Sequence, residues 1–167
     1  SYAGQIITLT YPQVGNYGVN KDDLQSKNLA LRGLVVHRIN TKPSNWRSET
    51  DLPSFLKKEG VVAIEDIDTR DLTRHIRDNG AQRAVISTVD SDGESLLEKV
   101  RNSPSIVGEN MAKTVSCAEP YEFNGVAKTH EFALGLPPQA KYHVVAYDCG
   151  AKRSILSGLV YVGCKVT

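Results

Sequence analysis

Cys149 occupies the position in this sequence that most resembles that of a nucleophile. It follows a predicted buried strand, residues 143–148, and precedes a predicted helix. A thiol at the N-terminus of a helix can have a lowered pKa and attack a carbonyl carbon. However, the sequence places no His or acidic residue to activate it, and its neighbours lack the glycines of a nucleophile elbow. We therefore expect Cys149 to pack in the core as a small apolar residue, and we expect the same of Cys117 and Cys164.

Ser1 is the second residue that chemistry could use. An N-terminal serine can act as a nucleophile with its own amine as the base. The chain begins without Met, three residues before a predicted strand, and stops inside another predicted strand at residues 164–167. We therefore expect a piece of a longer polypeptide rather than a catalytic Ser1.

The histidines and glycines predict no metal or nucleotide site. No HExxH, GxGxxG or P-loop motif occurs. The glycine-rich residues 15–20 follow a strand but do not open a helix, so a structural turn is favoured over a phosphate-binding loop. The histidines are too scattered for a metal triad: His37, His75, His130 and His143.

Two features are typical of protein interfaces. Arg70, Arg74 and Arg77 fall on one face of the predicted helix 69–78. This face is either solvated and balanced by nearby aspartates or a docking surface, because Arg is enriched at interfaces. Trp46, beside an arginine in a loop, is likewise either a core anchor or an interface anchor. On the same helix, Leu72 and Ile76 form the predicted buried stripe.

The elements that must position these residues alternate between strand and helix. Pro137-Pro138 indicates a linker, and residues 140–167 read as the first strand, helix and second strand of a parallel sheet. The fold class is therefore α/β. Strands are predicted at 5–10, 33–37, 61–64, 84–89 and 143–148, and helices at 52–59, 69–78, 94–102 and 152–162, with a helix-compatible stretch at 21–28.

Charge and composition exclude several classes of protein. The 20 basic and 19 acidic residues give a net charge of +1, which offers no reason to bind nucleic acid or an anionic membrane. No apolar stretch is long enough to span a bilayer. Three widely spaced cysteines suggest a reducing compartment, hence the cytoplasm, and no structural zinc.

Ordered motifs along the chain carry a family resemblance. Their order and number make the match specific, and they run the length of the chain. The sequence resembles the small subunit of carbamoyl-phosphate synthetase, the glutamine-hydrolysing chain. The motifs are Ser1-Tyr2-Ala3-Gly4-Gln5-Ile6, Thr10-Tyr11-Pro12, Gly15-Asn16-Tyr17-Gly18-Val19-Asn20, Ser44-Asn45-Trp46-Arg47, Asp66-Ile67-Asp68-Thr69-Arg70-Asp71-Leu72-Thr73-Arg74, Arg77-Asp78-Asn79-Gly80 and residues 144–152.

The resemblance implies a fold and a function. Residues 1–139 would be a swivelling β/β/α N-terminal domain, incomplete at its start. Residues 140–167 would begin a class I glutamine amidotransferase domain. The full subunit would hydrolyse L-glutamine and pass ammonia to a large subunit, which makes carbamoyl phosphate from bicarbonate and ATP for pyrimidine and arginine synthesis. ATP and a metal ion would bind that large subunit, and no cofactor would bind this chain.

The same resemblance assigns one site residue. Ser1 matches a serine that contacts the substrate glutamine, and a hydroxyl can exchange hydrogen bonds with its polar groups. The family's catalytic Cys, His and Glu lie later than residue 167, so no catalytic residue is expected here. Two alternatives stay open: a non-enzymatic protein-binding module, and a hydrolase that uses Cys149.

Overall fold

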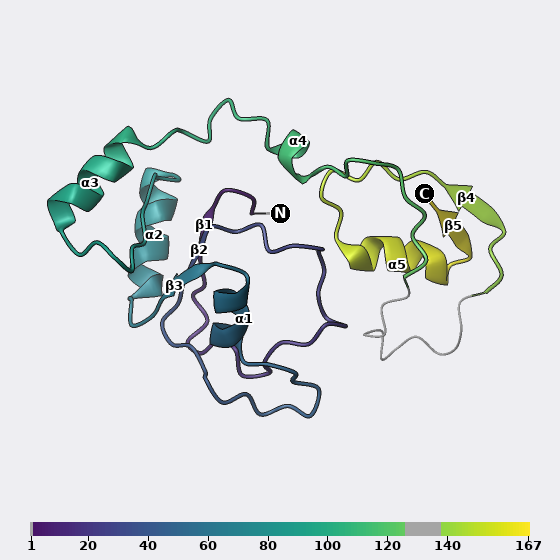
Figure 1. Cartoon of the computed structure of the whole chain (residues 1–167), viewed down its shortest axis with the longest axis horizontal. Helices are drawn as coiled ribbons and strands as arrows, with labels where there is room; N and C mark the ends of the chain where they lie inside the picture. The colour runs from purple at the N-terminus through teal and green to yellow at the C-terminus, as the bar shows by residue number, and fades with distance from the viewer. Residues whose placement is uncertain (1, 126–137) are drawn as a thin grey trace. The chain divides into compact units, whose positions relative to one another are not determined.

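The computed structural model describes residues 2–125 and 138–167, which fall into two compact units (Figure 1). The first unit contains the residues up to 19 together with residues 30–109. The second contains residues 20–29 and the described residues from 110 onward. The predicted division at residues 139 and 140 concerns the domains of a longer polypeptide, and it stays a prediction.

The first unit is built on a parallel sheet with the strand order β1-β2-β3. Its strands are β1 (Ile6–Thr8), β2 (Gly33–Val35) and β3 (Val62–Ile64). Ile7 pairs with Leu34, which pairs with Ala63. The central strand is buried along its whole length, as expected for a parallel strand with neighbours on both sides. The sequence therefore predicted these three strands correctly, and their parallel pairing comes from the structure.

Helices α1 (Leu52–Lys58) and α2 (Thr69–Asn79) begin and end where local signals place them. The Asp51 carboxylate accepts a hydrogen bond from the Ser54 amide at 2.8 Å, and Asp68 does the same for Asp71 at 2.9 Å. These caps satisfy N–H groups that have no partner within a helix. Gly60 follows α1 with a φ of 69°, a left-handed conformation that glycine adopts without strain.

Helix α3 (Gly93–Asn102) is held at both ends by side chains that precede it. Asp90 accepts hydrogen bonds from Ser95 and Lys99 near the start. Arg83 donates to the carbonyl oxygens of Arg101, at 2.9 Å, and Ser103, at 2.6 Å, and so covers the other end. These contacts hold α3 in the absence of any buried residue along it.

The predicted strand at 84–89 is wrong, because these residues pair with no strand. Ile86 is half-buried against Gly33, where an added Cβ would lie 3.0 Å from the Ile86 side chain. The other apolar members are exposed, including Val89 at 96%. A β-branched composition therefore does not by itself provide a strand with a pairing partner. The stretch 21–28 is likewise not helical.

The second unit contains the predicted strand, helix and parallel strand. They are β4 (Tyr142–Val144), α5 (Arg153–Tyr161) and β5 (Cys164–Val166), with Tyr142 paired to Cys164. The short helix α4 (Met111–Val115) was not predicted. The core of this unit is formed by Leu156, Cys164 and Val166, with Phe123 packed against it.

The parallel sheets confirm the α/β class, while the swivelling architecture and the amidotransferase start stay predictions. Among the described residues, every helix is too short and too polar to cross a membrane.

Candidate functional site

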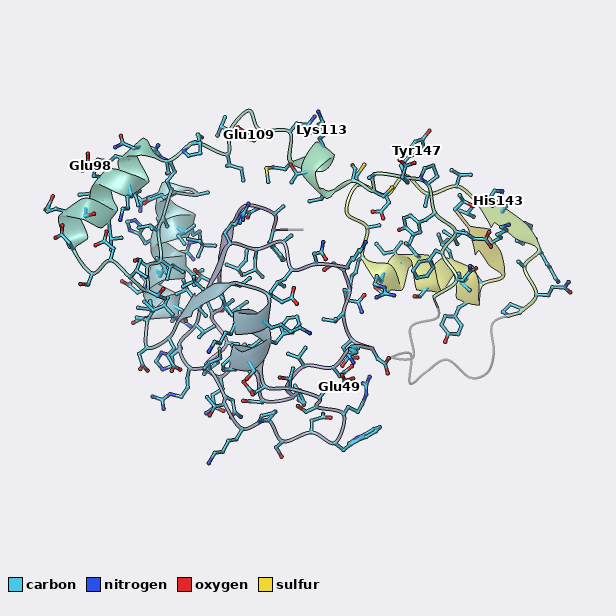
Figure 2. The ribbon with its side chains drawn as sticks, in the orientation of Figure 1. Glu49, Glu98, Glu109, Lys113, His143 and Tyr147 are labelled. Carbon is cyan, nitrogen blue, oxygen red and sulfur yellow. The ribbon has the colours of Figure 1, made fainter. Side chains whose placement is uncertain are left out.

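A pocket of about 270 Å³ lies in the second unit, where the chain leaves β4 and β5. Its apolar wall includes Phe123, Leu156 and Val166, and its polar rim includes Tyr121 and Asp148. Figure 2 shows His143 on β4 and Tyr147 beyond that strand. Ligands of parallel α/β sheets bind at the carboxyl ends of the strands, so the pocket lies where chemistry would be expected.

The polar rim of this pocket is organised by Asp148. One carboxylate oxygen, Oδ2, accepts a hydrogen bond from the Tyr121 hydroxyl at 2.6 Å. The other, Oδ1, accepts from the backbone amides of Gly150, at 2.9 Å, and Ala151, at 2.7 Å. Asp148 therefore closes the turn that follows β4 and ties it to the segment that contains Tyr121.

The pair has opposite pKa shifts with a common origin. The Tyr121 hydrogen bond, followed by that of the Ala151 amide, lowers the pKa of Asp148. The hydrogen bond to Asp148, followed by burial, raises the pKa of Tyr121 to about 12. At neutral pH the carboxylate is therefore charged and the phenol keeps its proton. The pair is suited to holding the turn, and neither group is suited to exchanging a proton with a substrate.

Helix α5 begins next to this turn without a cap of its own. Lys152 stands at the N-cap position and makes no side-chain capping hydrogen bond. Gln25 supplies the acceptors instead. Its backbone oxygen accepts from the Arg153 amide at 2.9 Å, and its side-chain Oε1 accepts from the Ser154 amide at 3.0 Å. A residue distant in the sequence thus completes the start of the helix that carries Leu156.

The cysteines are only partly as predicted. Cys164 is buried in the core of the second unit, as expected, whereas Cys149 and Cys117 are exposed, so their predicted packing role is wrong. Cys149 lies in the tight turn between β4 and α5, after the strand has ended, and no layer of side chains covers it. His143 Nε2 forms a hydrogen bond with the Thr167 hydroxyl oxygen, Oγ1, at 2.9 Å. The described residues contain no group of side chains suited to hold a metal ion.

Ser1 lies outside the described residues, so its predicted contact with glutamine stays a prediction. The chain just after it is ordered by two backbone hydrogen bonds. The Gln5 amide donates to the Tyr2 carbonyl at 3.1 Å, and the Gly4 amide donates to the Ala30 carbonyl at 3.4 Å. This turn leads directly into β1.

The glycine-rich residues 15–20 form a structural turn, as favoured from the sequence. The Gly18 amide donates to the Gly15 carbonyl at 3.0 Å, and Val19 forms an isolated bridge with Thr50. Gly18 has a φ of 67°, and an added Cβ would lie 2.0 Å from the Ser48 hydroxyl. The turn therefore packs closely against the neighbouring loop at Gly18.

That neighbouring loop presents Trp46 to solvent. The indole is 90% exposed, so the interpretation of Trp46 as a core anchor is wrong. The loop is nonetheless ordered: the Ser44 amide donates to the Asn16 carbonyl at 2.9 Å, and the Arg47 amide donates to Asn45 Oδ1 at 2.8 Å. A large exposed aromatic side chain on an ordered loop is typical of an interface anchor.

Helix α2 separates its apolar and basic residues as predicted. Leu72 and Ile76 are half-buried, whereas Arg70 and Arg74 are exposed. Arg77 is also exposed and forms an ion pair with Asp78 at 3.0 Å. The helix therefore offers cations to solvent.

The sequence analysis missed three of the residues that organise these sites. An Asp side chain in a turn often accepts a hydrogen bond from the amide two residues later, so the bond from Gly150 to Asp148 could have been predicted. Nothing local to Gln25 or Tyr121 indicates their partners, which lie 129 and 27 positions away.

Comparisons with known proteins agree on one family. The family model described as carbamoyl-phosphate synthase small chain, CPSase domain, matches residues 1–86. The carbamoyl phosphate synthase small chain of Syntrophotalea carbinolica is 49% identical over 171 residues, which cover 100% of this chain and 45% of that protein. The protein of the same name from Thermotoga maritima is 45% identical, covering 99% of this chain and 39% of the relative. That from Escherichia coli is 46% identical, covering 100% and 45%. The chain thus spans less than half the length of these relatives.

Proposed function

Because the chain belongs to the family of carbamoyl-phosphate synthase small chains, we propose that it is part of a subunit that hydrolyses L-glutamine and delivers ammonia to a large subunit. The large subunit would use this ammonia, bicarbonate and ATP to make carbamoyl phosphate. The observation that carries the proposal is identity of 45–49% to small chains over 99–100% of this chain. A non-enzymatic binding module is not favoured by these relatives.

The division of labour follows from where the proposed chemistry lies. The catalytic Cys, His and Glu would belong to the part of the small chain beyond residue 167, and ATP and a metal ion would bind the large subunit. Residues 140–167 would begin the amidotransferase domain, and their β4-α5-β5 order supports that assignment. Residues 1–139 would be the N-terminal, swivelling-type domain, incomplete at its start. All three cysteines lack a disulfide bond, which supports a cytoplasmic location.

Ser1 is proposed to contact the substrate glutamine. In the full-length chain, Ser1→Ala would then raise the KM for glutamine severalfold, because one neutral hydrogen bond is worth about 1 kcal/mol. The kcat would change little, and Ser91→Ala, at an exposed position, serves as the control. An unchanged KM would remove Ser1 from the glutamine site.

Two exposed features of the first unit are proposed to contact the large subunit. The arginine face of α2 carries Arg70 and Arg74, for which no ion pair with a described residue is formed. The second feature is the ordered loop that presents Trp46. Cations of this kind steer association with an acidic surface, and a central aromatic residue adds affinity.

The proposed activity is tested with the full-length chain and its large subunit. Glutamine, bicarbonate and ATP should together give carbamoyl phosphate, and ammonia should replace glutamine. If the pair makes carbamoyl phosphate from ammonia but not from glutamine, the glutamine-hydrolysing role is wrong. If it makes none from either source, the chain is not part of this synthase.

A further inference from the structure

The turn between β4 and α5, residues 148–152, and the first residues of α5 are held from two sides by residues distant in the sequence. On one side, Gln25 accepts hydrogen bonds from the amides of Arg153 and Ser154. On the other, the Tyr121 hydroxyl bonds Asp148, whose second oxygen accepts from the amides of Gly150 and Ala151. Four N–H groups between residues 150 and 154 therefore depend on two remote contacts.

The first contact belongs to a segment that we call the strap, residues 20–29. The chain enters the strap from the first unit at residue 19 and returns to that unit at residue 30, but the strap itself packs with the second unit. It has no helix or strand, and local hydrogen bonds shape it, including those from the Asp23 amide to Asn20 and from Ser26 to the Asn28 carbonyl. Gln25 is half-buried within it.

The start of α5 needs an external acceptor for a physical reason. The first N–H groups of a helix have no partners within it, and this end of the helix is electropositive. Here the residues at that end are Lys152 and Arg153, which are cations and add to the unfavourable charge. The oxygens of Gln25 offset both deficits, so docking of the strap and formation of the first turn of α5 stabilise each other.

The second contact, which we call the latch, is the pair Tyr121 and Asp148. It acts on the same short segment, because Asp148 accepts hydrogen bonds from the amides of Gly150 and Ala151, and only one residue separates these amides from those bonded to Gln25. Both members of the latch line the pocket, together with Tyr147. A change in the turn therefore changes the rim of the pocket.

We propose that the strap and the latch form one cooperative clamp on the turn at 148–152, so that release of either one frees the whole turn and remodels the rim of the pocket. The clamp is a conformational device of the fold and does not depend on which reaction the full-length protein performs.

Amide hydrogen exchange in the full-length chain tests the clamp. The variants are Gln25→Ala, Tyr121→Phe and the double variant, with Gln13→Ala and Tyr11→Phe as matched controls at exposed positions of the first unit. Either single substitution should speed exchange of the amides of residues 150, 151, 153 and 154 together, by about tenfold. The double variant should exceed the faster single variant by less than about twofold, because the turn is already free. The controls should leave these amides unchanged.

Independent contacts would give a different pattern. In that case Gln25→Ala would affect only Ser154, Tyr121→Phe would affect only Gly150 and Ala151, and the effects would not spread. Such a pattern, or multiplication of the two effects to about a hundredfold at one amide, would overturn the clamp. Gln25→Glu keeps the acceptor oxygen, so the four amides should exchange as slowly in this variant as in the parent chain. Exchange as fast as in Gln25→Ala would also overturn it.

Discussion

The hydroxyl of Tyr121 donates a 2.6 Å hydrogen bond to the carboxylate of Asp148, which lies 27 positions later in the chain. The Asp148 carboxylate also accepts hydrogen bonds from the backbone amides of Gly150 and Ala151, in the turn that precedes α5. Because a charged acceptor strengthens a hydrogen bond, this contact joins two segments of the second unit more firmly than a neutral pair would. The contact also makes the stability of the second unit depend on pH, at both high and low pH.

The first prediction concerns that dependence. The pKa of Tyr121 is raised to about 12 by its bond to Asp148, so its contribution to stability is present below the ordinary tyrosine pKa of about 10 and is lost as pH rises from there towards 12. The pKa of Asp148 is lowered, so its contribution is present above the ordinary aspartate value and is lost as pH falls through the lowered one.

The measurement is an NMR titration of the Tyr121 ring in the full-length chain and in Asp148→Asn. Removing the charge should bring the pKa of Tyr121 down towards 10. An unchanged Tyr121 pKa in the variant would show that the carboxylate is not the cause of the shift.

The second prediction concerns the arginine face of α2. Arg74→Glu should weaken association with the large subunit roughly fivefold, because reversal of a charge at the rim of an interface costs about 1 kcal/mol. The loss should shrink in high salt. Arg101→Glu makes the same change on exposed α3 and is the control. Equal Kd values for Arg74→Glu and the parent chain, measured by titration calorimetry, would exclude α2 from the interface.

The third prediction concerns Trp46. If its indole is an interface anchor, Trp46→Ala should raise the Kd for the large subunit about thirtyfold, which corresponds to about 2 kcal/mol. The Tm of the free chain should not change, because the indole is 90% exposed and holds no core together. Tyr11→Ala, at another exposed aromatic position, is the comparison. A lower Tm with an unchanged Kd would assign Trp46 to stability instead.

The fourth prediction concerns the glycine-rich turn. In Gly18→Ala the new Cβ would lie 2.0 Å from the Ser48 hydroxyl and 2.8 Å from the Thr50 carbonyl oxygen, in addition to the strain of a φ of 67°. The free energy of unfolding should fall by about 2–4 kcal/mol. Gly80→Ala has a similar φ of 81° but meets nothing within 4 Å, so it should cost only about 1 kcal/mol. Urea unfolding compares the two, and equal losses would show that the turn yields to the added methyl group.

The sequence by itself determined the elements whose signals are local. Helices α1, α2 and α3 follow from apolar spacing, with Asp68 as a cap and glycines at the ends, and the structure has them within about a residue or two of the predicted bounds. The parallel strand, helix and strand of the second unit follow from the order of apolar runs. The family could be predicted from ordered motifs, because these are short runs of sequence that are recognised without the structure.

Only the tertiary structure decided pairing, exposure and remote contacts. Residues 84–89 have the composition of a strand but pair with no other strand. Cys149 is of a residue type that is often buried, but it lies exposed in a turn. Gln25 caps α5 from 129 positions away, which no window of sequence contains. The reason is physical: a cap or an apolar stripe depends on neighbours within one or two turns of the chain. A strand partner or the burial of a side chain depends on which distant segments meet when the chain folds.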